Sequence, residues 1–354
     1  MKSLMITKYG ELSTSLEIQE VPIPSIAPNQ ILIKTHASSF NPLDYKIVRG
    51  DFKAMRKIQF PKGIGRDVSG VIEHVGEKVE KFKAGEKVCS RIDESLVGTM
   101  ADYVISNADD VSLLPSNLKH EEIAGIPLVG LTSYQALVDV AKLLPGENIL
   151  IHAGAGGVGS IAIQLAKHLR TKVTTTTSTS NIGLVQKLGA DNIIDYTKQS
   201  YLEEGPKFDV VFDTLGGKYT LDSFKVLKKG GRVVSIAGDV DSITTKQLGL
   251  NRIIRFLLRL KAKKVTNWVT NQIVDQCNWS GHFDNQELET IKKQVMENTQ
   301  VRFANISVKA SDEFMQAVDE QKQYCKGEYL IYKKKKNKIL YNAPQDIDNI
   351  HYSI

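Results

Sequence analysis

The sequence predicts an α/β protein in which a β-rich unit is joined to a doubly wound parallel sheet. Three observations predict it: a glycine loop between a strand and a helix, alternating strands and helices after residue 121, and short strands with turn residues before it. The loop lies in NILIHAGAGGVGSIAIQLAK, residues 148–167, where an apolar run enters and a segment of helical periodicity leaves. This order is typical of a dinucleotide-binding turn, in which a helix N-terminus faces a pyrophosphate.

Each glycine of the loop has an expected role. Gly154 permits the tight turn, Gly156 leaves out a Cβ that would block the pyrophosphate, and Gly159 lets the helix pack closely on the strand. Gly157 and Val158 begin the helix, where free N–H groups can bind an anion. Since structural turns without a ligand carry the same letters, the flanking strand and helix are what favour nucleotide binding.

Composition indicates a soluble globular protein of more than one domain. The chain has 354 residues, 42% hydrophobic and 24% charged, and about 150 residues per domain is usual. The formal charge of +6 is modest and concentrated in residues 252–264 and 333–338, which argues against a nucleic-acid surface. Three scattered cysteines (Cys89, Cys277 and Cys325) fit a reducing cytoplasm. Neither a signal peptide nor a transmembrane segment is expected.

The elements follow from periodicity and turn residues. In the first 120 residues, strands are expected at residues 4–6, 16–18, 31–35, 69–75 and 102–105. Then come a helical stretch at 121–141, a strand at 149–153, a helix at 160–169, a strand at 172–176, a helix at 182–188, strands at 192–195 and 209–212, a helix at 221–226 and a strand at 232–237. Strands that alternate with helices imply a parallel sheet.

Several blocks resemble the medium-chain dehydrogenase/reductase family, in its zinc-independent quinone oxidoreductase branch, which includes the zeta-crystallin and alkenal/enone reductase types. They are PKGIGRDVSGVIEHVG (61–76), GLTSYQAL (130–137), the glycine-loop block (143–167), KLGADNIIDY (187–196), FDVVFDTLGG (208–217) and LKKGGRVVSIAG (227–238). The resemblance implies a GroES-like β-rich catalytic domain at 1–122, a Rossmann NADP-binding domain at 123–265, and a return to the catalytic domain at 266–335. Residues 336–354 are expected to be a tail, which with the lysine run at 333–338 is solvated and partly mobile.

Departures from the zinc-using branch bear on the chemistry. There a Cys and a Gly-His-Glu hold the metal, whereas the matching positions here are Asn41 and Gly65-Arg66-Asp67. An amide and a guanidinium cannot replace thiolate and imidazole, so no metal is expected. The seven histidines are expected to be surface or capping residues. Arg66 and Asp67 either form an ion pair beside a turn, which we favour, or border the substrate cleft.

The end of the second strand of the parallel sheet indicates the cofactor. An NAD-binding protein would carry Asp or Glu there, but residues 176–181 are only Thr, Ser and Asn, which favours NADPH. By resemblance, Ser178, Asn181 and Tyr196 surround the 2′-phosphate, although the branch often has Lys or Arg where this chain has Ser180. A Thr/Ser-rich turn with no ligand role is the alternative.

Further cofactor contacts are expected at the carboxyl edge of the sheet. These residues are Leu215, Gly216, Ile236 and Ala237. Asp213 either belongs to this edge or caps a turn. By resemblance, Thr132 approaches the nicotinamide ribose, with a plain core helix as the alternative.

The resemblance implies hydride transfer from NADPH to a quinone or an α,β-unsaturated carbonyl. Without a metal, hydrogen-bond donors must polarise the acceptor carbonyl. Asn41 would do so through its amide N–H, Tyr45 would be the proton donor, and Asp44 would position the ribose or an acceptor hydroxyl. The alternative is that these are turn residues of NPLDY. A homodimer through an edge strand of the Rossmann sheet is also expected.

A second class of function depends on residues 248–264, which form a basic amphipathic pattern. Such a helix could recruit a membrane or a partner, and the protein would then be a catalytically weak nucleotide-binding interaction protein. A helix of the folded protein with a solvated basic face is favoured, in a cytoplasmic enzyme.

Overall fold

The computed structural model describes residues 1–53, 57–93, 96, 98–116, 118–237, 331–335 and 338–339. They fall into two compact units: unit 1 holds Met1–Leu131 with two C-terminal strands, and unit 2 begins at Thr132. The domain boundaries expected from the sequence stay a prediction. The expected basic helix, Gly238, and nearly all of the return segment and tail lie outside the described residues.

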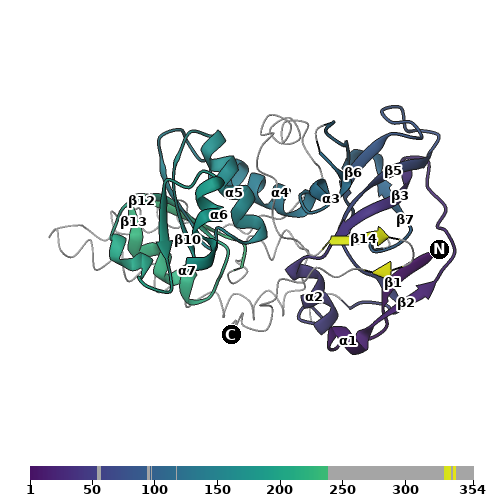
Figure 1. Cartoon of the computed structure of the whole chain (residues 1–354), viewed down its shortest axis with the longest axis horizontal. Coiled ribbons are helices and arrows are strands. Elements are labelled where there is room, and N and C mark those ends of the chain that lie inside the picture. The colour runs from purple at the N-terminus through teal and green to yellow at the C-terminus, as the bar shows by residue number, and fades with distance from the viewer. Residues whose placement is uncertain are drawn as a thin grey trace, which may run out of the picture. The chain divides into compact units, whose positions relative to one another are not determined.

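Unit 1 is mainly antiparallel β-structure (Figure 1). Its seven-stranded sheet follows the order β15-β14-β3-β5-β6-β8, with β7 also paired to β3. The strands are β3 (Gln30–Ser39), β5 (Asp67–Val75), β6 (Lys87–Arg91), β7 (Tyr103–Asn107), β8 (Val111–Leu113), β14 (Ile331–Lys335) and β15 (Lys338–Ile339). A smaller sheet contains β1 (Lys2–Ile6), β2 (Leu16–Glu20) and β4 (Lys62–Gly63). The helical elements are α1 (Leu12–Ser15), α2 (Pro42–Arg49), η1 (Ala108–Asp110) and α3 (His120–Ile123). The predicted β-rich unit is confirmed.

The core of unit 1 follows from period-2 alternation. Ile31 and Ile33 of β3 point to the same face of the sheet and are fully buried. They pack in one cluster with Val68 and Ile72 of β5 and Val104 of β7. One face of β3 and β5 is therefore covered by this apolar cluster, and polar side chains of these strands are expected on the opposite face.

Strand β14 contains residues 333–335, the first part of the lysine run that the sequence predicts to be solvated and partly mobile. Its register with β3 pairs Ile331 with Ser39 and Lys333 with Ala37. On that edge of β3, β7 pairs only with residues 30–34. Backbone groups of residues 37–39 need partners, and β14 supplies them despite the poor strand propensity of lysine.

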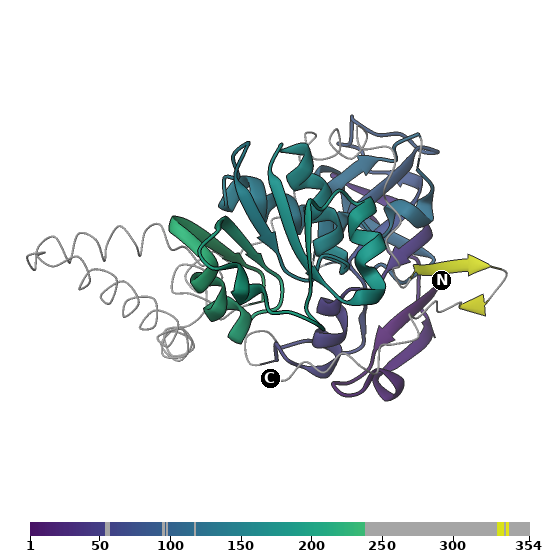
Figure 2. The same cartoon turned by 60° about the vertical axis from the view of Figure 1, so that its left-hand side comes forward.

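Unit 2 is a doubly wound parallel sheet (Figure 2). Its strand order is β11-β10-β9-β12-β13. Its strands are β9 (Asn148–Ile151), β10 (Lys172–Thr177), β11 (Asn192–Asp195), β12 (Phe208–Asp213) and β13 (Leu227–Ser235), all parallel to their neighbours. Its helical elements are π-helix η2 (Gln135–Val140), α5 (Gly157–His168), η3 (Thr179–Asn181), α6 (Ile182–Lys187), η4 (Tyr201–Glu204), α7 (Lys218–Ser223) and η5 (Phe224–Val226). Helix α4 (Pro127–Tyr134) runs across the boundary of the two units in the chain. No helix in the described part of the chain is long and apolar enough to span a bilayer.

Both faces of the parallel sheet are covered. In β9, Ile149 and Ile151 face a cluster that includes Ala162 and Ile163 of α5, whereas Leu150 faces a cluster on the other side with Tyr201. Since a strand buried on both faces reads as a continuous apolar run, the letters ILI at 149–151 predict its position.

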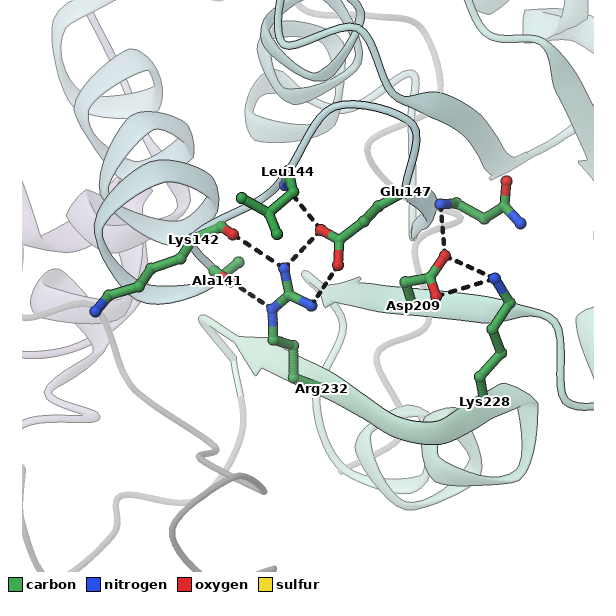
Figure 3. Close-up of polar contacts among 8 residues, drawn as sticks. Ala141, Lys142, Leu144, Glu147, Asp209, Lys228 and Arg232 are labelled. Atoms are coloured by element: carbon green, nitrogen blue, oxygen red, sulfur yellow. Dashed lines mark hydrogen bonds and ion pairs between the residues drawn. The ribbon is translucent and has the colours of Figure 1, made fainter.

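A polar network joins β13 to the end of η2 at the amino edge of this sheet (Figure 3). Arg232 donates to both oxygens of Glu147, at 2.8 and 2.7 Å, and to the main-chain carbonyls of Ala141 and Lys142. Lys142 is in the left-handed region with φ 49°. The guanidinium therefore caps the end of the π-helix and holds an unfavourable backbone conformation.

We expect Arg232→Ala to lower the free energy of unfolding by about 2–3 kcal/mol, because charge-assisted hydrogen bonds to Glu147 and two carbonyls are lost. Lys228→Ala is the matched control, since its ion pair with Asp209 joins side chains that are 42% and 26% exposed. An exposed pair contributes about 0–1 kcal/mol. Urea unfolding of the two variants measures the difference, and equal losses would contradict the capping role.

Candidate functional site

The glycine loop lies at the carboxyl edge of unit 2, between β9 and α5. Its left-handed residue is Ala153, with φ 51°, and Gly154 has no positive φ. A Cβ on Gly154 would lie 2.1 Å from Thr175 Oγ1 of β10. The role expected for Gly154 is thereby corrected: it is glycine because β10 packs against it, while Ala153 makes the turn.

The N-terminus of α5 is open where the sequence predicts an anion. Gly156 is the N-cap residue, and a Cβ there would meet only Ala153 O, at 3.2 Å. A Cβ on Gly159 would lie 2.2 Å from the same oxygen. Gly159 is thus required for close packing, whereas Gly156 leaves space in front of the helix.

Helix α4 supports this helix start. Ser133 Oγ donates to the carbonyl of Val158 at 3.1 Å, and Thr132 beside it is 4% exposed. Gly157 and Val158 form the first turn of α5, as expected. The contact holds the orphan N–H groups of that turn in one position.

The residues expected around a 2′-phosphate gather beyond β10 and β11. Ser178 Oγ accepts from Asn181 Nδ2 at 3.2 Å and lies 3.1 Å from Ser180 Oγ. Tyr196 follows β11, donates its N–H to the carbonyl of Thr177 and is 63% exposed. The parallel pairing of the two strands therefore brings Ser178, Asn181 and Tyr196 together at one edge.

One carboxylate near this cluster is absent from the sequence-based prediction. Asp195 ends β11 opposite Thr177 and accepts from the hydroxyls of Thr179 and Thr197. These hydrogen bonds lower its pKa to about 2. Its position at the end of a predicted strand was the available signal, but only the strand order puts it beside residues 178–181.

Asp213 organises the loops after β12 and β13. Its Oδ1 accepts from the N–H groups of Leu215 and Gly216, at 3.0 and 2.9 Å, and its Oδ2 from Thr220 and Ser235. It is fully buried. The sequence allows two roles for Asp213, a cofactor contact or a turn cap. Its hydrogen bonds come from residues that follow β12 and from the end of β13, so the carboxylate caps the turn.

The two loops meet through the main chain of residue 213. The N–H of Ile236 donates to the carbonyl of Asp213 at 3.0 Å. A Cβ on Gly216 would lie 2.2 Å from Ala237 O. The four residues expected at the carboxyl edge are thus adjacent there.

His152 overturns the expectation that every histidine is a surface or capping residue. It follows β9, is fully buried, and its Nε2 lies 3.2 Å from Ser223 Oγ. Burial lowers its pKa to about 4, although Asp213 opposes the shift. A neutral imidazole packed against Tyr201 is a core residue, which its place at the end of an apolar strand explains.

In unit 1, the residues of NPLDY begin α2 instead of forming an isolated turn. Asn41 is the N-cap, and its main-chain N–H donates to Asp44 Oδ2 at 2.7 Å. Asn41 and Asp44 are buried, whereas Tyr45 is half-buried with the Arg49 guanidinium 5.2 Å from its ring centroid. A carboxylate at this position satisfies an orphan N–H of the helix start.

Asp67 connects Asn41 to the rest of unit 1. Its Oδ2 accepts from Asn41 Nδ2 and Ser39 Oγ, both at 2.9 Å, and its Oδ1 from the N–H of Leu128 at 2.8 Å. Sequence reasoning missed Ser39 and Leu128, since one lies on β3 and the other contributes only its main chain. Asp67 is therefore part of a hydrogen-bonded network, and its ion pair with Arg66, which the sequence favours, stays a prediction.

Burial dominates the electrostatics of these carboxyl groups. It raises the pKa of Asp44 to about 7, opposed by the Asn41 N–H and the charge of Arg66 and reinforced by Asp67. It raises the pKa of Asp67 to about 6, opposed by its hydrogen bonds and by Arg91. The two groups are thus poised near neutral pH.

A catalytic zinc does not fit the residues at these positions. Asn41 turns its amide nitrogen to Asp67, and Arg66 is a buried guanidinium, so thiolate and imidazole ligands are lacking. Within the described ranges, no group of three His, Cys, Asp or Glu residues could hold a metal ion.

Comparison with known proteins agrees with both units. Residues 27–116 match the model of the alcohol dehydrogenase GroES-like domain, and residues 157–272 match that of the zinc-binding dehydrogenase family. The quinone oxidoreductase of Coxiella burnetii has a similar structure, with a TM-score of 0.63, 28% identity, and coverage of 95% of this chain and 99% of that one. The units thus define a dehydrogenase with a GroES-like and a Rossmann domain.

Curated relatives define the family. A chloroplastic quinone-oxidoreductase QR1 of Triphysaria versicolor is 32% identical over 281 residues, 75% of this chain and 85% of that protein. The 2-methylene-furan-3-one reductase of Solanum lycopersicum is 40% identical over 249 residues, and the chloroplastic NADPH-dependent alkenal/one oxidoreductase of Arabidopsis thaliana is 38% identical over 248. The latter two matches cover 68% of this chain and 63% of each relative. The chain belongs to the medium-chain dehydrogenase/reductase family.

Proposed function

We propose that this chain is an NADPH-dependent oxidoreductase that transfers a hydride to a quinone or an α,β-unsaturated carbonyl. The observation that carries the proposal is the carboxyl edge of unit 2, where an open helix N-terminus and the Asp213 loops suit a dinucleotide. The names of the tomato, Arabidopsis and Triphysaria relatives support the acceptor class.

The residues proposed to hold NADPH are Thr132, Gly154, Gly156, Gly157, Val158, Gly159, Ser178, Asn181, Tyr196, Leu215, Gly216, Ile236 and Ala237. When bound, the reduced nicotinamide supplies the hydride. The first turn of α5 would bind the pyrophosphate through its N–H groups, and the polar cluster after β10 would bind the 2′-phosphate.

Asn41, Asp44 and Tyr45 are the residues proposed to act on the acceptor, without zinc. An N–H of Asn41 would polarise the acceptor carbonyl, and Tyr45 would donate a proton. Asp44 would position a hydroxyl. Their clustering at the start of α2 supports this assignment, because one helix N-terminus presents all three.

Turnover is the test of this function. We expect oxidation of NADPH, followed by its absorbance, with a small quinone or a small enone, and we expect it to survive dialysis against a chelator. Tight NADPH binding with no turnover on either acceptor would instead support an interaction protein, and activity that zinc restores after dialysis would refute metal-free catalysis.

Nucleotide choice can be tested at the polar cluster after β10. The double variant Ser178→Ala/Asn181→Ala is expected to bind NADPH about tenfold more weakly, a loss of ~1.4 kcal/mol, because two donors to the 2′-phosphate are removed. NADH, which lacks that phosphate, is the internal control. Equal losses for both nucleotides in a fluorescence titration would contradict the assignment.

Oligomeric state and compartment are part of the same proposal. We propose a homodimer in the cytoplasm that has no nucleic-acid partner. The Arabidopsis and Triphysaria relatives are chloroplastic, which makes compartment a point for direct test. Light scattering of the purified chain and microscopy of a tagged chain measure these properties.

A further inference from the structure

The carboxylate of Asp195 ties the loop after β10 to the end of β11. Its Oδ2 accepts from Thr179 Oγ1 at 2.5 Å, and its Oδ1 accepts from both the N–H and the hydroxyl of Thr197, at 3.0 and 2.7 Å. The two threonine hydroxyls are 3.1 Å apart. Because a carboxylate oxygen has two lone-pair sites, Oδ1 is fully used, and the group fastens the loop instead of binding a ribose hydroxyl.

Lys198 places a cation beside this carboxylate. Its Nζ lies 3.5 Å from Asp195 Oδ2, the oxygen that also accepts from Thr179. The side chain of Lys198 is 66% exposed, whereas that of Asp195 is 9% exposed. An ammonium has three N–H donors, and the contact is longer than the roughly 2.7–3.2 Å of a hydrogen bond. Attraction between the charges therefore holds the ammonium near the loop while its donors still face outward.

The backbone of Lys198 is fixed at the same place. Its main-chain N–H donates to the carbonyl of Asp195 at 3.0 Å, so the chain turns directly after β11. Asp195 pairs with Thr177, the last residue of β10, across the two parallel strands. Lys198 and residues 178–181 thus extend from neighbouring strand ends at the carboxyl edge of unit 2. In a dinucleotide fold the adenosine ribose lies at the end of the second strand, which here is β10.

Charge at this edge explains what the cation is for. A phosphate monoester carries about −1.5 to −2 charges near pH 7, and an ionised Asp195 repels it. The threonine hydroxyls that donate to Asp195 lower its pKa to about 2, so the carboxyl group is ionised at neutral pH. Among residues 178–181 and 196–200, which follow β10 and β11, Lys198 is the only cationic side chain. The serine and asparagine side chains can donate hydrogen bonds but cannot offset this repulsion.

We propose that Lys198 is a specificity-determining residue whose ammonium pairs with the 2′-phosphate of NADPH, while Asp195 holds that ammonium at the end of β11. This inference rests on the proposed function and adds a residue to its nucleotide site. NADH has a hydroxyl in place of the phosphate, so it gains nothing from the cation. The lysine therefore selects between the two nucleotides through charge, in addition to the hydrogen bonds of Ser178 and Asn181.

The first test is Lys198→Met, which keeps a long side chain and removes the charge. We expect the dissociation constant for NADPH to rise about tenfold, as for the loss of a hydrogen bond to a charged group. The dissociation constant for NADH should not change. Lys198→Arg keeps the charge and should bind NADPH nearly as well as wild type. Fluorescence titration measures these constants, and unchanged NADPH binding by Lys198→Met would overturn the proposal.

Lys207→Met is the matched control. Lys207 also follows an acidic residue by three positions and forms an ion pair with it, Glu204, and its side chain is 42% exposed. It directly precedes β12, however, and so lies at the amino edge of the same sheet. We expect this variant to bind NADPH as wild type does. Equal losses in the two variants would show that only the net charge of the chain matters, against the proposal.

A fragment of the cofactor keeps this inference distinct from the proposed function. Adenosine 2′,5′-bisphosphate carries the 2′-phosphate without a nicotinamide, and adenosine 5′-monophosphate lacks that phosphate. We expect wild type to prefer the bisphosphate, and Lys198→Met to lose about tenfold of this preference. If wild type bound neither NADPH nor the bisphosphate, the proposed function would fail and this inference with it. If wild type bound both and Lys198→Met kept the full preference, only the role of Lys198 would be refuted.

Discussion

Gly159→Ala is expected to abolish NADPH binding and to lower the free energy of unfolding by about 3 kcal/mol or more. The new methyl group would lie 2.2 Å from Ala153 O and 2.8 Å from Gly154 Cα. Both are main-chain atoms that cannot rotate away, so the first turn of α5 must move off β9. Urea unfolding and NADPH fluorescence titration measure the two effects.

Two matched glycines distinguish packing from cofactor approach. Gly156→Ala should unfold almost like wild type, since its Cβ meets only one oxygen at 3.2 Å, yet bind NADPH at least tenfold more weakly. Gly183→Ala should gain about 0.5–1 kcal/mol, because its Cβ position in α6 is open. Undiminished NADPH binding by Gly156→Ala would argue against a pyrophosphate at this helix.

The free energy of unfolding is expected to fall by about 4 kcal/mol through Asp44 alone as pH rises from about 4 to above 7. Burial raises the pKa of Asp44 from 3.8 to about 7. Between these values the folded chain holds a proton that the unfolded chain has released. The contribution of Asp44 to the free energy of unfolding is therefore fully present below about pH 4, and it is lost as the carboxyl group ionises in the folded chain. Asp67, whose pKa burial raises to about 6, acts in the same direction.

Asp44→Asn should remove this part of the pH dependence. The amide oxygen can still accept from the N–H of Asn41, but no buried charge forms at high pH. Asp209→Asn is a control of opposite sign. Burial raises the pKa of Asp209, but the hydrogen bonds from Lys228 and from the N–H of Asn148 lower it by more, so the net shift is downwards. That variant should lose stability at neutral pH, not at acid pH. Urea unfolding at several pH values measures this. If the free energy of unfolding depended on pH in the same way for wild type and Asp44→Asn, the ionisation of a buried Asp44 would not be its cause.

Most elements of unit 2 are predictable from the sequence because their apolar residues recur with a regular period and turn residues mark where each element ends. The runs at 149–153, 172–176, 192–195 and 209–212 become β9 to β12 with small shifts at their ends. Antiparallel strands are harder: β6 and β8 are short and are absent from the predicted elements. The NPLDY segment reads as turn residues because α2 has only eight residues and begins with a proline.

Positions in the candidate site divide the same way. Ser178, Asn181 and Tyr196 could be named by resemblance to the family, and they meet in the structure because neighbouring parallel strands end at one edge. The partners of Asn41 could not, because Ser39, Asp67 and Leu128 are far apart in the chain and meet only when β3, β5 and α4 pack.

The order of residues alone was enough for the family, the glycine loop and the alternation of strand and helix, because these depend on local periodicity and on spacing within a few turns. Folding in three dimensions settled which atoms meet: it placed Ala153, and not a glycine of the loop, in the left-handed region, buried His152, and turned the Asn41 amide towards Asp67. Those outcomes depend on long-range packing and on the cost of burying unpaired polar groups, which no short stretch of sequence contains.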